Sequence, residues 1–408
     1  MKIGLIRERK SPPDKRVAFT PSQCHEIILK HPEIQFIIEP SDVRCIPDAL
    51  YQSIGFHVGP EMDICDILFG IKEVPPAQLI FGKTYFFFSH TIKKQAHNQK
   101  LLREVLNQKI TLIDYECLIN ERGERTVAFG RFAGIVGAYN ALRMWMYRFH
   151  QIPLKPANEC GDMEEMMDYA RHHLAVLGHV KIAVTGTGRV GKGAEELLLG
   201  LGLKKLEPKE YLNSDFSCPV FTVLSSSHYY EHPDAMAWSE NHFRNNPGEY
   251  RSKFMDFAVS TDVFIPCHYW NPAAPALFSS KDMQKPRFRI RVISDVTCDL
   301  EGSVPSTIRT STIAEPFYDL DPVAFSESPA FSSEKNITVC AIDNLPCELP
   351  FDASEAFGRM LIENVIPELV SGKWKSLEKA TIARDGRLMP DFQYLEDYAF
   401  DGEKAEKI

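Results

Sequence analysis

The sequence predicts an α/β protein made of two Rossmann-like domains, each with a parallel sheet, separated by an active-site cleft. Two observations support this fold class. Short apolar runs alternate with helical stretches, as a parallel sheet with crossover helices requires. The second half also contains Gly186, Gly188 and Gly191 in the spacing G-x-G-x-x-G, between a strand-like run and a helical run. We expect residues 1–128 and 345–408 to form one domain and residues 129–344 the other.

The first domain begins with a strand at residues 2–6 and a helix at 21–30, for which Thr20 is a candidate N-cap. Its other expected elements are strands at 34–38, 64–71, 85–88 and 110–113 and a helix at 94–107. Prolines at 75 and 76 end the third strand. The aromatic run at 86–88 is interpreted as core rather than as a binding box. A helix at 352–369 is expected to return to this domain.

The second domain is expected to begin with a helix at 130–150. Small residues on one side of it, Ala133, Gly134, Gly137 and Ala138, suit a helix that joins two domains. Its other expected elements are helices at 162–177 and 190–201 and strands at 181–185, 203–206, 220–224, 263–266 and 291–296. Residues 244–251 and 272–275 are interpreted as loops or insertions. The polar tail from Asp401 onward is expected to be frayed.

The glycine motif has the context that a dinucleotide site needs. Gly186 permits a tight turn, Gly188 allows close approach of a pyrophosphate, and Gly191 allows helix and strand to pack closely. The helix N-terminus directs free N–H groups at the phosphates. Glu207, at the end of the next strand-like run, is a candidate ligand of the ribose hydroxyls. The alternative is a glycine-rich turn in some other α/β protein.

The composition argues against several classes of partner and cofactor. A net charge of −9 without a long basic run argues against nucleic acid and anionic membranes as partners. Met1 to Lys10 lacks the apolar core of a secretory signal, and no apolar run approaches 18 residues. The ten cysteines are scattered singly, which argues against a metal site and favours reduced thiols in a cytoplasmic protein. Cys340 and Cys347 are interpreted as packing residues.

Two residues that follow strands of the first domain are candidates for acid–base chemistry. Lys72 can act as a general acid or base if burial or a neighbouring cation lowers its pKa, and a histidine such as His90 titrates near neutrality without help. Arg16 and Arg125 are candidates for holding carboxylates, and Asp114 and Glu116 for orienting a base. Taken singly, each has a plainer interpretation. Lys72 can be a surface lysine, and His90 a capping or solvent-facing histidine. The two arginines can be surface residues, and the two carboxylates can merely end a strand.

Ordered motifs along nearly the whole chain resemble one family. They are Arg16-Val-Ala-Phe-Thr-Pro21, Gly70-Ile-Lys-Glu-Val-Pro75, Phe87-Phe-Ser-His-Thr-Ile-Lys93, Leu112-Ile-Asp-Tyr-Glu116, Val127-Ala-Phe-Gly130, Thr185-Gly-Thr-Gly188, His268-Tyr-Trp270, Ser294-Asp-Val-Thr297 and Ile342-Asp-Asn-Leu-Pro346. The chain resembles the lysine-forming saccharopine dehydrogenases and the lysine–2-oxoglutarate reductase half of the bifunctional lysine-degrading enzyme, distant relatives of alanine dehydrogenase. The likeness to the reductase half is the closer one.

The resemblance implies a substrate or catalytic first domain and an oxidoreductase that interconverts saccharopine with L-lysine and 2-oxoglutarate. Lys72 and His90 become the acid–base pair. The implied substrate contacts are Arg16, Lys72, Gln95, Glu116, Arg125, Phe129, Thr297, Cys298 and Asp299. The implied cofactor contacts, besides Gly186 and Gly191, are Gly188, Arg189, Glu207, Tyr269, Val296, Ile342, Asp343, Asn344 and Leu345. Two positions depart from the fungal pattern, Glu124 in place of an arginine and Val190 in place of a cysteine.

The implied cofactor is NAD or NADP. A carboxylate at Glu207 favours NAD, because it binds the ribose hydroxyls and repels a 2′-phosphate. The reductase half uses NADPH, however, and Lys209 is close enough in sequence to offset that charge. Two alternatives to the main interpretation stay open: an alanine-dehydrogenase-like enzyme for a small amino acid, and a nucleotide-sensing relative without activity. The Arg16 and Arg125 pairing favours the larger substrate, and intact Lys72 and His90 argue against the sensor.

Overall fold

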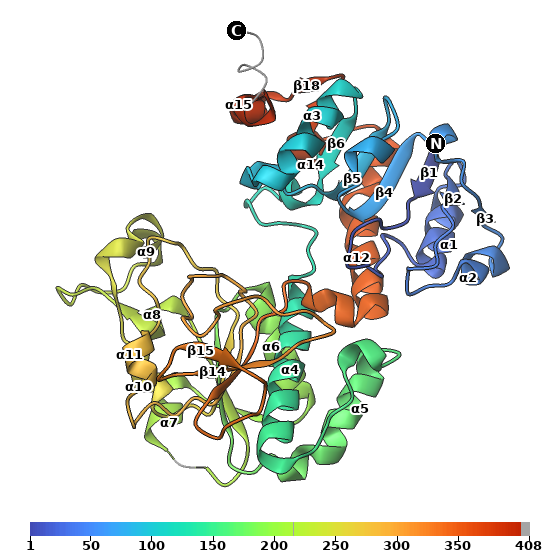
Figure 1. Cartoon of the computed structure of the whole chain (residues 1–408). Helices are drawn as coiled ribbons and strands as arrows, with labels where there is room; N and C mark the ends of the chain where they lie inside the picture. The colour runs from blue at the N-terminus through green and yellow to red at the C-terminus, as the bar shows by residue number, and fades with distance from the viewer. Residues whose placement is uncertain (215, 401–408) are drawn as a thin grey trace. The chain divides into compact units, whose positions relative to one another are not determined.

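The computed structural model describes residues 1–214 and 216–400, and these form two compact units (Figure 1). The first unit comprises Met1–Phe129 and the segment from Pro350 onward, and the second is Gly130–Leu349. Each unit contains one eight-stranded, mostly parallel sheet with helices, so the predicted fold class is confirmed. The assignment of a substrate role to one unit and a dinucleotide role to the other stays a prediction. The tail from Asp401, predicted to be frayed, lies outside the described residues.

The sheet of the first unit has the strand order β18-β17-β6-β5-β4-β1-β2-β3. Six parallel strands form its body: β1 (Lys2–Leu5), β2 (Gln35–Ile38), β3 (His57–Val58), β4 (Ile67–Lys72), β5 (Thr84–Phe88) and β6 (Thr111–Asp114). The last segment adds β17 (Thr381–Arg384), antiparallel to β6, and β18 (Arg387–Leu388). The sequence did not indicate these two strands. Because β1 to β6 are parallel, their carboxyl ends share one edge of the sheet.

Both faces of this sheet are buried, as the aromatic run in β5 illustrates. Phe86 and Phe88 belong to the apolar cluster on one face, and Tyr85 and Phe87 belong to the cluster on the other. Successive side chains of a strand point to opposite faces, so a continuous apolar run serves both layers. The interpretation of residues 86–88 as core is therefore confirmed.

Helices cover the sheet of the first unit. They are α1 (Pro21–Lys30), α2 (Asp48–Ser53), α3 (Gln99–Asn107), α12 (Pro350–Asn364), α13 (Ile366–Ser371), α14 (Ser376–Ala380) and α15 (Glu396–Phe400). Thr20 caps α1 as predicted, in a reciprocal capping box with Gln23. The Gln23 side chain also donates to the carbonyl of Glu355, and the backbone N–H of Val17 donates to Ser354. These bonds and the contact with α1 attach α12 to this unit, where Figure 1 draws it in orange.

Two helices of the first unit differ from the sequence prediction. The helix expected at 94–107 begins only at Gln99, because Lys94 adopts a left-handed backbone with φ of 52° and Gln95 is extended. The helix expected at 352–369 is broken between α12 and α13. Pro367 lies in the first turn of α13, where its missing N–H costs nothing, whereas inside one continuous helix it would remove a hydrogen bond.

The sheet of the second unit has the order β15-β14-β16-β13-β12-β7-β9-β8. Its strands are β7 (Lys181–Thr185), β8 (Lys204–Lys205), β9 (Val220–Leu224), β12 (Val263–Pro266), β13 (Val292–Ser294), β14 (Tyr318–Asp321), β15 (Ser326–Ser328) and β16 (Ile337–Cys340). The unpredicted strands β14 and β15 are antiparallel and the rest are parallel. Strand β9 lies beside β7, and β8, which comes earlier in the chain, lies at the outer edge. A separate small ribbon pairs β10 (Tyr230–Glu231) with β11 (Arg251–Ser252).

The helices of the second unit are α4 (Gly130–His150), α5 (Met163–His173), α6 (Arg189–Gly200), α7 (Pro208–Asn213), α8 (Ser226–Tyr229), α9 (Glu240–Asn245), α10 (Met255–Ala258) and α11 (Ser280–Met283). The stretch expected as a loop or insertion at 244–251 includes the end of α9, a 3-10 turn at Pro247–Glu249 and the start of β11.

Helices α4 and α6 pack side by side at very close range (Figure 1). A Cβ placed on Gly134 would lie 1.8 Å from the carbonyl oxygen of Val190, and one on Gly193 would lie 2.0 Å from that of Arg131. A Cβ on Gly137 would meet the side chain of Val296. The small residues of α4 therefore serve contacts inside the second unit, and they fix α6 against it.

Candidate active site and dinucleotide pocket

The carboxyl ends of β4, β5 and β6 bring together the acid–base candidates of the first unit. Lys72 is the last residue of β4, His90 follows β5 by two residues, and Glu116 follows β6 by two. The strands pair in parallel, with Phe87 of β5 opposite Asp114 of β6. The sequence predicted strand-end positions for these residues, and the sheet places the strands that carry them side by side.

Asp114 joins the loops that carry His90 and Glu116. Its buried carboxylate accepts hydrogen bonds from the Ser89 backbone N–H at 3.0 Å and from the Ser89 hydroxyl, and its other oxygen accepts from the Glu116 N–H at 2.7 Å. His90 itself has a left-handed backbone, with φ of 54°. Such a conformation costs a non-glycine residue about 1 kcal/mol or more, so bonds on the preceding residue are needed to hold it.

Glu116 is the centre of an ion-pair cluster. One of its oxygens lies 3.2 Å from His90 Nδ1, and the other lies 3.3 Å from Lys93 Nζ and pairs with Arg125. Burial alone would raise the pKa of Glu116, but the hydrogen bond from His90 and the charges of Arg125 and Lys93 lower it to about 2. Glu116 is therefore a carboxylate at neutral pH that orients the imidazole of His90. His90 occupies the N-cap position of the 3-10 turn Thr91–Lys93, but its side chain makes no capping bond.

Lys72 lies in a different electrostatic environment. Burial lowers the pKa of its ammonium, and the nearby positive charges of Arg16 and Lys10 lower it further. Within residues 1–214 and 216–400, no hydrogen bond or ion pair engages Lys72 Nζ. A half-buried amine with a depressed pKa is suited to proton transfer, and the interpretation of Lys72 as an ordinary surface lysine is wrong.

Arg16 is buried, so its interpretation as a surface arginine is also wrong. It pairs with Asp14 through two nitrogens, Nε at 3.0 Å and Nη2 at 2.6 Å. Its guanidinium lies 4.1 Å from the ring centroid of Phe129, which in turn stacks on Phe357 at 4.3 Å. Asp14 and the aromatic rings therefore fix the plane of the guanidinium.

Sequence reasoning missed two carboxyl groups in this unit, those of Glu8 and Asp14. Glu8 accepts from the backbone N–H groups of Ile71 at 2.6 Å and Lys72 at 2.9 Å, and burial together with the charge of Asp14 raises its pKa to about 8. The sequence signal that could have identified Glu8 was its place just after the first strand, on the edge shared with β4.

Gln95, a predicted substrate contact, is exposed, and its backbone carbonyl accepts a hydrogen bond from the Tyr398 hydroxyl.

In the second unit, the glycine turn between β7 and α6 has the geometry that a diphosphate needs. Gly186 has φ of +93°, and a Cβ there would lie 2.7 Å from the carbonyl oxygen of Cys267. A Cβ on Gly191 would lie 1.8 Å from the carbonyl oxygen of Gly186, whereas one on Gly188, the N-cap of α6, would meet nothing within 4 Å. The turn is thus tight where helix and strand meet and open where a phosphate would approach the helix N-terminus.

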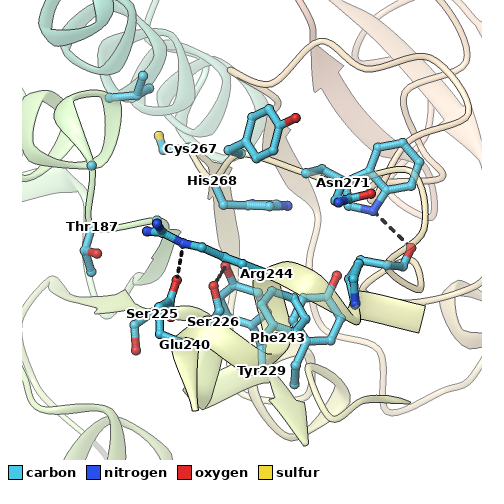
Figure 2. Close-up of a pocket in the computed structure, with 18 of the residues that line it drawn as sticks. Thr187, Ser225, Ser226, Tyr229, Glu240, Phe243, Arg244, Cys267, His268 and Asn271 are labelled. Carbon is cyan, nitrogen blue, oxygen red and sulfur yellow. Dashed lines mark hydrogen bonds and ion pairs between the residues drawn. The ribbon is translucent and has the colours of Figure 1, made fainter. Parts of the chain in front are cut away.

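This turn opens into a cavity of about 770 Å³ within the second unit (Figure 2). The cavity is lined by the glycine turn, including Arg189, by the residues after β9 and β12, among them Tyr269, and by α9. His268 is fixed between the hydroxyls of Thr185 at 2.7 Å and Ser303 at 2.9 Å. Burial lowers the pKa of His268 to about 4, so this wall of the cavity is neutral at pH 7.

The other residues implied by the resemblance do not line this cavity. Glu207 is exposed, follows the edge strand β8 and occupies the N-cap position of α7 without a side-chain capping bond. Val296 and Thr297 follow β13, where Asp295 accepts from the N–H and hydroxyl of Thr297. Cys298 has φ of 56° and Asp299 is exposed.

The segment after β16 contains buried Ile342 and Leu345 and exposed Asp343. The side-chain amide of Asn344 in this segment donates a hydrogen bond to Cys347 Sγ. Cys340 and Cys347 are buried and belong to the packing, as interpreted.

The described residues hold neither a helix long and apolar enough to cross a membrane nor a cluster of three or more metal-ligating side chains.

Comparison with known proteins finds similar proteins over most of the chain. Residues 4–136 match the family "Alanine dehydrogenase/PNT, N-terminal domain". The mitochondrial alpha-aminoadipic semialdehyde synthase of Bos taurus is 30% identical over 91% of this chain and 45% of its own length. The saccharopine dehydrogenase [NAD(+), L-lysine-forming] of Neurospora crassa is 24% identical over 86% of this chain and 87% of its own. A solved L-alanine dehydrogenase shares the fold, with a TM-score of 0.66 at 17% identity, covering 98% of this chain and all of that one.

The fold and the glycine turn define a class, the two-unit α/β proteins with a G-x-G-x-x-G turn between a strand and a helix of the second unit. Within that class, the chain is similar to the L-lysine-forming saccharopine dehydrogenases over most of its length and shares the fold of alanine dehydrogenase, so the predicted resemblance is confirmed. It spans about half the length of the curated relatives that it matches first.

Proposed function

We propose that this chain is an NAD(P)-dependent oxidoreductase acting on a CH–NH bond, which interconverts saccharopine with L-lysine and 2-oxoglutarate. The observation that carries the proposal is the pairing at adjacent strand ends of a lysine with a depressed pKa, Lys72, and a histidine hydrogen-bonded to a carboxylate, His90 with Glu116. The printed names of the relatives, which include saccharopine dehydrogenases, give the substrate class.

The reaction needs proton transfers that these residues can make. The ε-amine of lysine attacks the keto carbon of 2-oxoglutarate to give a carbinolamine, which loses water to give an imine. Lys72 accepts the proton that leaves the attacking nitrogen, and His90 donates a proton to the departing hydroxyl. Glu116 stabilises the imidazolium of His90 before that donation. The dinucleotide, when bound, supplies the hydride that reduces the imine carbon.

Saccharopine carries three carboxylates, and the first unit offers cations to bind them. Arg16, Lys93 and Arg125 belong to the cluster around Lys72 and His90. We propose that Arg16 and Arg125 hold carboxylates of the substrate, with Gln95 and Phe129 as further contacts. The same proposal includes Thr297, Cys298 and Asp299 from the second unit as substrate contacts.

The glycine turn fits a dinucleotide, and we propose that NAD or NADP binds there. Gly186, Gly188, Arg189 and Gly191 would hold the diphosphate and Tyr269 would contact the adenosine half, whereas Val296, Ile342, Asp343, Asn344 and Leu345 would serve the nicotinamide half. The argument for NAD depended on Glu207 at the end of the strand next to β7. Because β9 occupies that place and Glu207 lies outside the cavity lining, this preference loses its support.

A coupled assay tests the proposal. Purified protein is given lysine, 2-oxoglutarate and NADH or NADPH, and oxidation of the cofactor is followed at 340 nm, with saccharopine identified by mass spectrometry. Pyruvate with ammonia replaces the two substrates in a parallel arm, because the shared fold of alanine dehydrogenase makes that reaction the main alternative. Turnover only in the second arm would overturn the proposal, and cofactor binding without turnover in either arm would favour a sensor.

A further inference from the structure

The strand order of the second unit changes which residues adjoin the adenosine ribose of a bound dinucleotide. In dinucleotide folds, the residue that binds the ribose 2′-hydroxyl follows the strand next to the glycine-turn strand. Here that strand is β9, paired with β7 along its whole length from Lys181↔Val220 to Thr185↔Leu224. Strand β8, which carries Glu207 at its end, pairs only with β9 and is one strand further away. The residues that follow β9 are Ser225, Ser226 and Ser227, so no carboxylate stands at this position.

The wall opposite the glycine turn comes from an inserted segment, residues 226–258, between β9 and β12. It contributes Ser226, Tyr229, Tyr230, Glu240, Phe243, Arg244 and Pro247 to the lining of the cavity. Figure 2 shows Arg244 reaching from α9 into the pocket, with a dashed line to Glu240. Arg244 and Glu240 are the charged residues that α9 adds to a lining whose other charged side chain is Arg189.

The pair between Arg244 and Glu240 is loose. The Nε–Oε1 distance is 3.4 Å, and the two side chains are 75% and 55% exposed. Exposed ion pairs of this kind contribute little free energy, so the guanidinium can exchange partners at small cost. Ser225 is already engaged, since its hydroxyl bonds to His228 Nδ1 at 2.8 Å, whereas among the residues that the structure describes the Ser226 hydroxyl has only a long contact of 3.5 Å to Tyr229.

We propose that Ser226 and Arg244 read the 2′ position of the adenosine ribose and that the site prefers a 2′-phosphorylated adenine dinucleotide. This inference depends on the proposed use of a dinucleotide by the second unit. A carboxylate after β9 would repel a 2′-phosphate, and serine removes that repulsion. The guanidinium of Arg244 binds a phosphate through two parallel hydrogen bonds, with a dianion taking the place of Glu240. The Ser226 hydroxyl donates a further bond.

Binding of adenosine fragments tests this inference without any enzymatic activity. Isothermal titration of the full chain compares 2′,5′-ADP with 5′-ADP, which differ only in the 2′-phosphate. We expect 2′,5′-ADP to bind ~10- to 100-fold more tightly, the value of a charge-assisted contact. Arg244→Ala should abolish most of this difference and leave the affinity for 5′-ADP within about threefold. Ser226→Ala should reduce the difference by a smaller factor.

Two matched variants serve as controls. Arg251→Ala removes another exposed arginine of the same inserted segment, one that pairs with Glu231 at 2.8 Å and does not line the cavity. Glu207→Gln tests the position that sequence spacing suggested. Both should keep the wild-type ratio of the two affinities. Equal binding of the two fragments by the wild type, an unchanged ratio in Arg244→Ala, or a ratio that rises in Glu207→Gln would overturn the inference.

The outcome is separable from that of the proposed reaction. Tight 2′,5′-ADP binding that depends on Arg244, in a protein that does not turn over lysine and 2-oxoglutarate, would support this inference and count against the proposed substrates. Saccharopine formation with NADH preferred over NADPH would support the reaction and overturn the inference.

Discussion

Among single residues, Asp114 shows how one buried side chain organises a functional site. It bonds to the residue before His90 and to the backbone of Glu116, so the histidine and its carboxylate partner are fixed by the same group. The sequence places Asp114 at the end of a strand but does not reveal that its two oxygens bond in two directions. That depends on the pairing of β5 with β6, which brings Ser89 within reach.

The proposed acid–base pair predicts specific losses of activity. Lys72→Met and His90→Gln should each lower kcat by ~10²–10⁴, the usual contribution of a positioned acid or base. Cofactor affinity should barely change, since both residues belong to the first unit and the glycine turn to the second. The double variant should lose less than the product of the single losses, because residues that act as a unit are not additive. Steady-state kinetics and cofactor titration measure these effects.

Lys30→Met and His25→Gln are the matched controls, since both side chains are exposed on helix α1 rather than at the strand ends that carry Lys72 and His90. They should keep kcat within a few-fold. Near-wild-type turnover in Lys72→Met or His90→Gln, with an unchanged circular dichroism spectrum, would remove that residue from the mechanism.

Arg125 is expected to act mainly in substrate binding. Arg125→Ala should raise KM for 2-oxoglutarate by the equivalent of ~1.5–3 kcal/mol, the range for a hydrogen bond to a charged group. Kinetics with varied 2-oxoglutarate measure this, and an unchanged KM would place Arg125 outside the substrate site. The arginine also pairs with Glu116, so its loss should raise the pKa of that carboxyl from about 2. The acid limb of the pH–rate profile should therefore move to higher pH.

Among elements, the contact between α4 and α6 sets a strict requirement for glycine. Gly193→Ala would place a methyl group 2.0 Å from the backbone oxygen of Arg131, which cannot rotate away. The helices must then separate, and we expect a destabilisation of ~1–3 kcal/mol, the usual cost of overpacking. Urea unfolding followed by circular dichroism measures it.

Gly200→Ala is the control on the same helix. Its added methyl group meets only the terminal carbon of Met167, a flexible side chain, so the cost should be small. Equal effects of the two substitutions would show that helix propensity, rather than the α4–α6 contact, determines the result.

The elements also show what a sequence can and cannot predict here. Strands β7, β9 and β12 and helix α4 were predicted within a residue or two, because apolar periodicity and β-branched content are local properties. The positions of β8 and β9 in the sheet were not predictable in this way. The spacing rule assumes that the strand after the glycine helix, here β8, pairs directly with the glycine-turn strand β7. In this sheet β9 lies between β7 and β8, so the assumption does not hold. Lys72, His90 and Glu8 all lie at or just after strand ends, but the burial that raises the pKa of Glu8 to about 8 depends on packing between distant segments, so Glu8 was missed.

For the whole molecule, stability should fall as pH rises through neutrality. Burial raises the pKa of Glu348 to about 7, that of Glu8 to about 8 and that of Asp295 to about 6. A carboxyl whose pKa is higher in the folded than in the unfolded state contributes stability that is fully present below its unfolded pKa and is lost as pH rises through its folded pKa. For Glu348, this window runs from about pH 4.5 to about 7.

Glu348→Gln removes one of these groups while keeping its oxygen as the acceptor for Asn140. At pH 8 the variant should be more stable than the wild type by ~3 kcal/mol, because the pKa of Glu348 is 4.5 in the unfolded chain and about 7 in the folded one, and at pH 4 the two should be alike. Scanning calorimetry at both pH values measures the difference. Glu301→Gln, at an exposed position, should show no such dependence. A Glu348→Gln variant that is less stable at pH 8 would show that the carboxylate is needed in its charged form.

The first unit is discontinuous in sequence, and this has a consequence during synthesis. The ribosome releases residues 130–349 before the segment that carries α12 and β17. Until that segment arrives, β6 has no partner on its outer side, and the ring faces of Phe129 and Tyr115 that later contact Phe357 stay exposed to water. The second unit can fold as soon as its own chain is complete, whereas the first waits with an open sheet edge and uncovered aromatic surface. Such nascent chains are natural clients of chaperones and prone to aggregate when synthesis stalls.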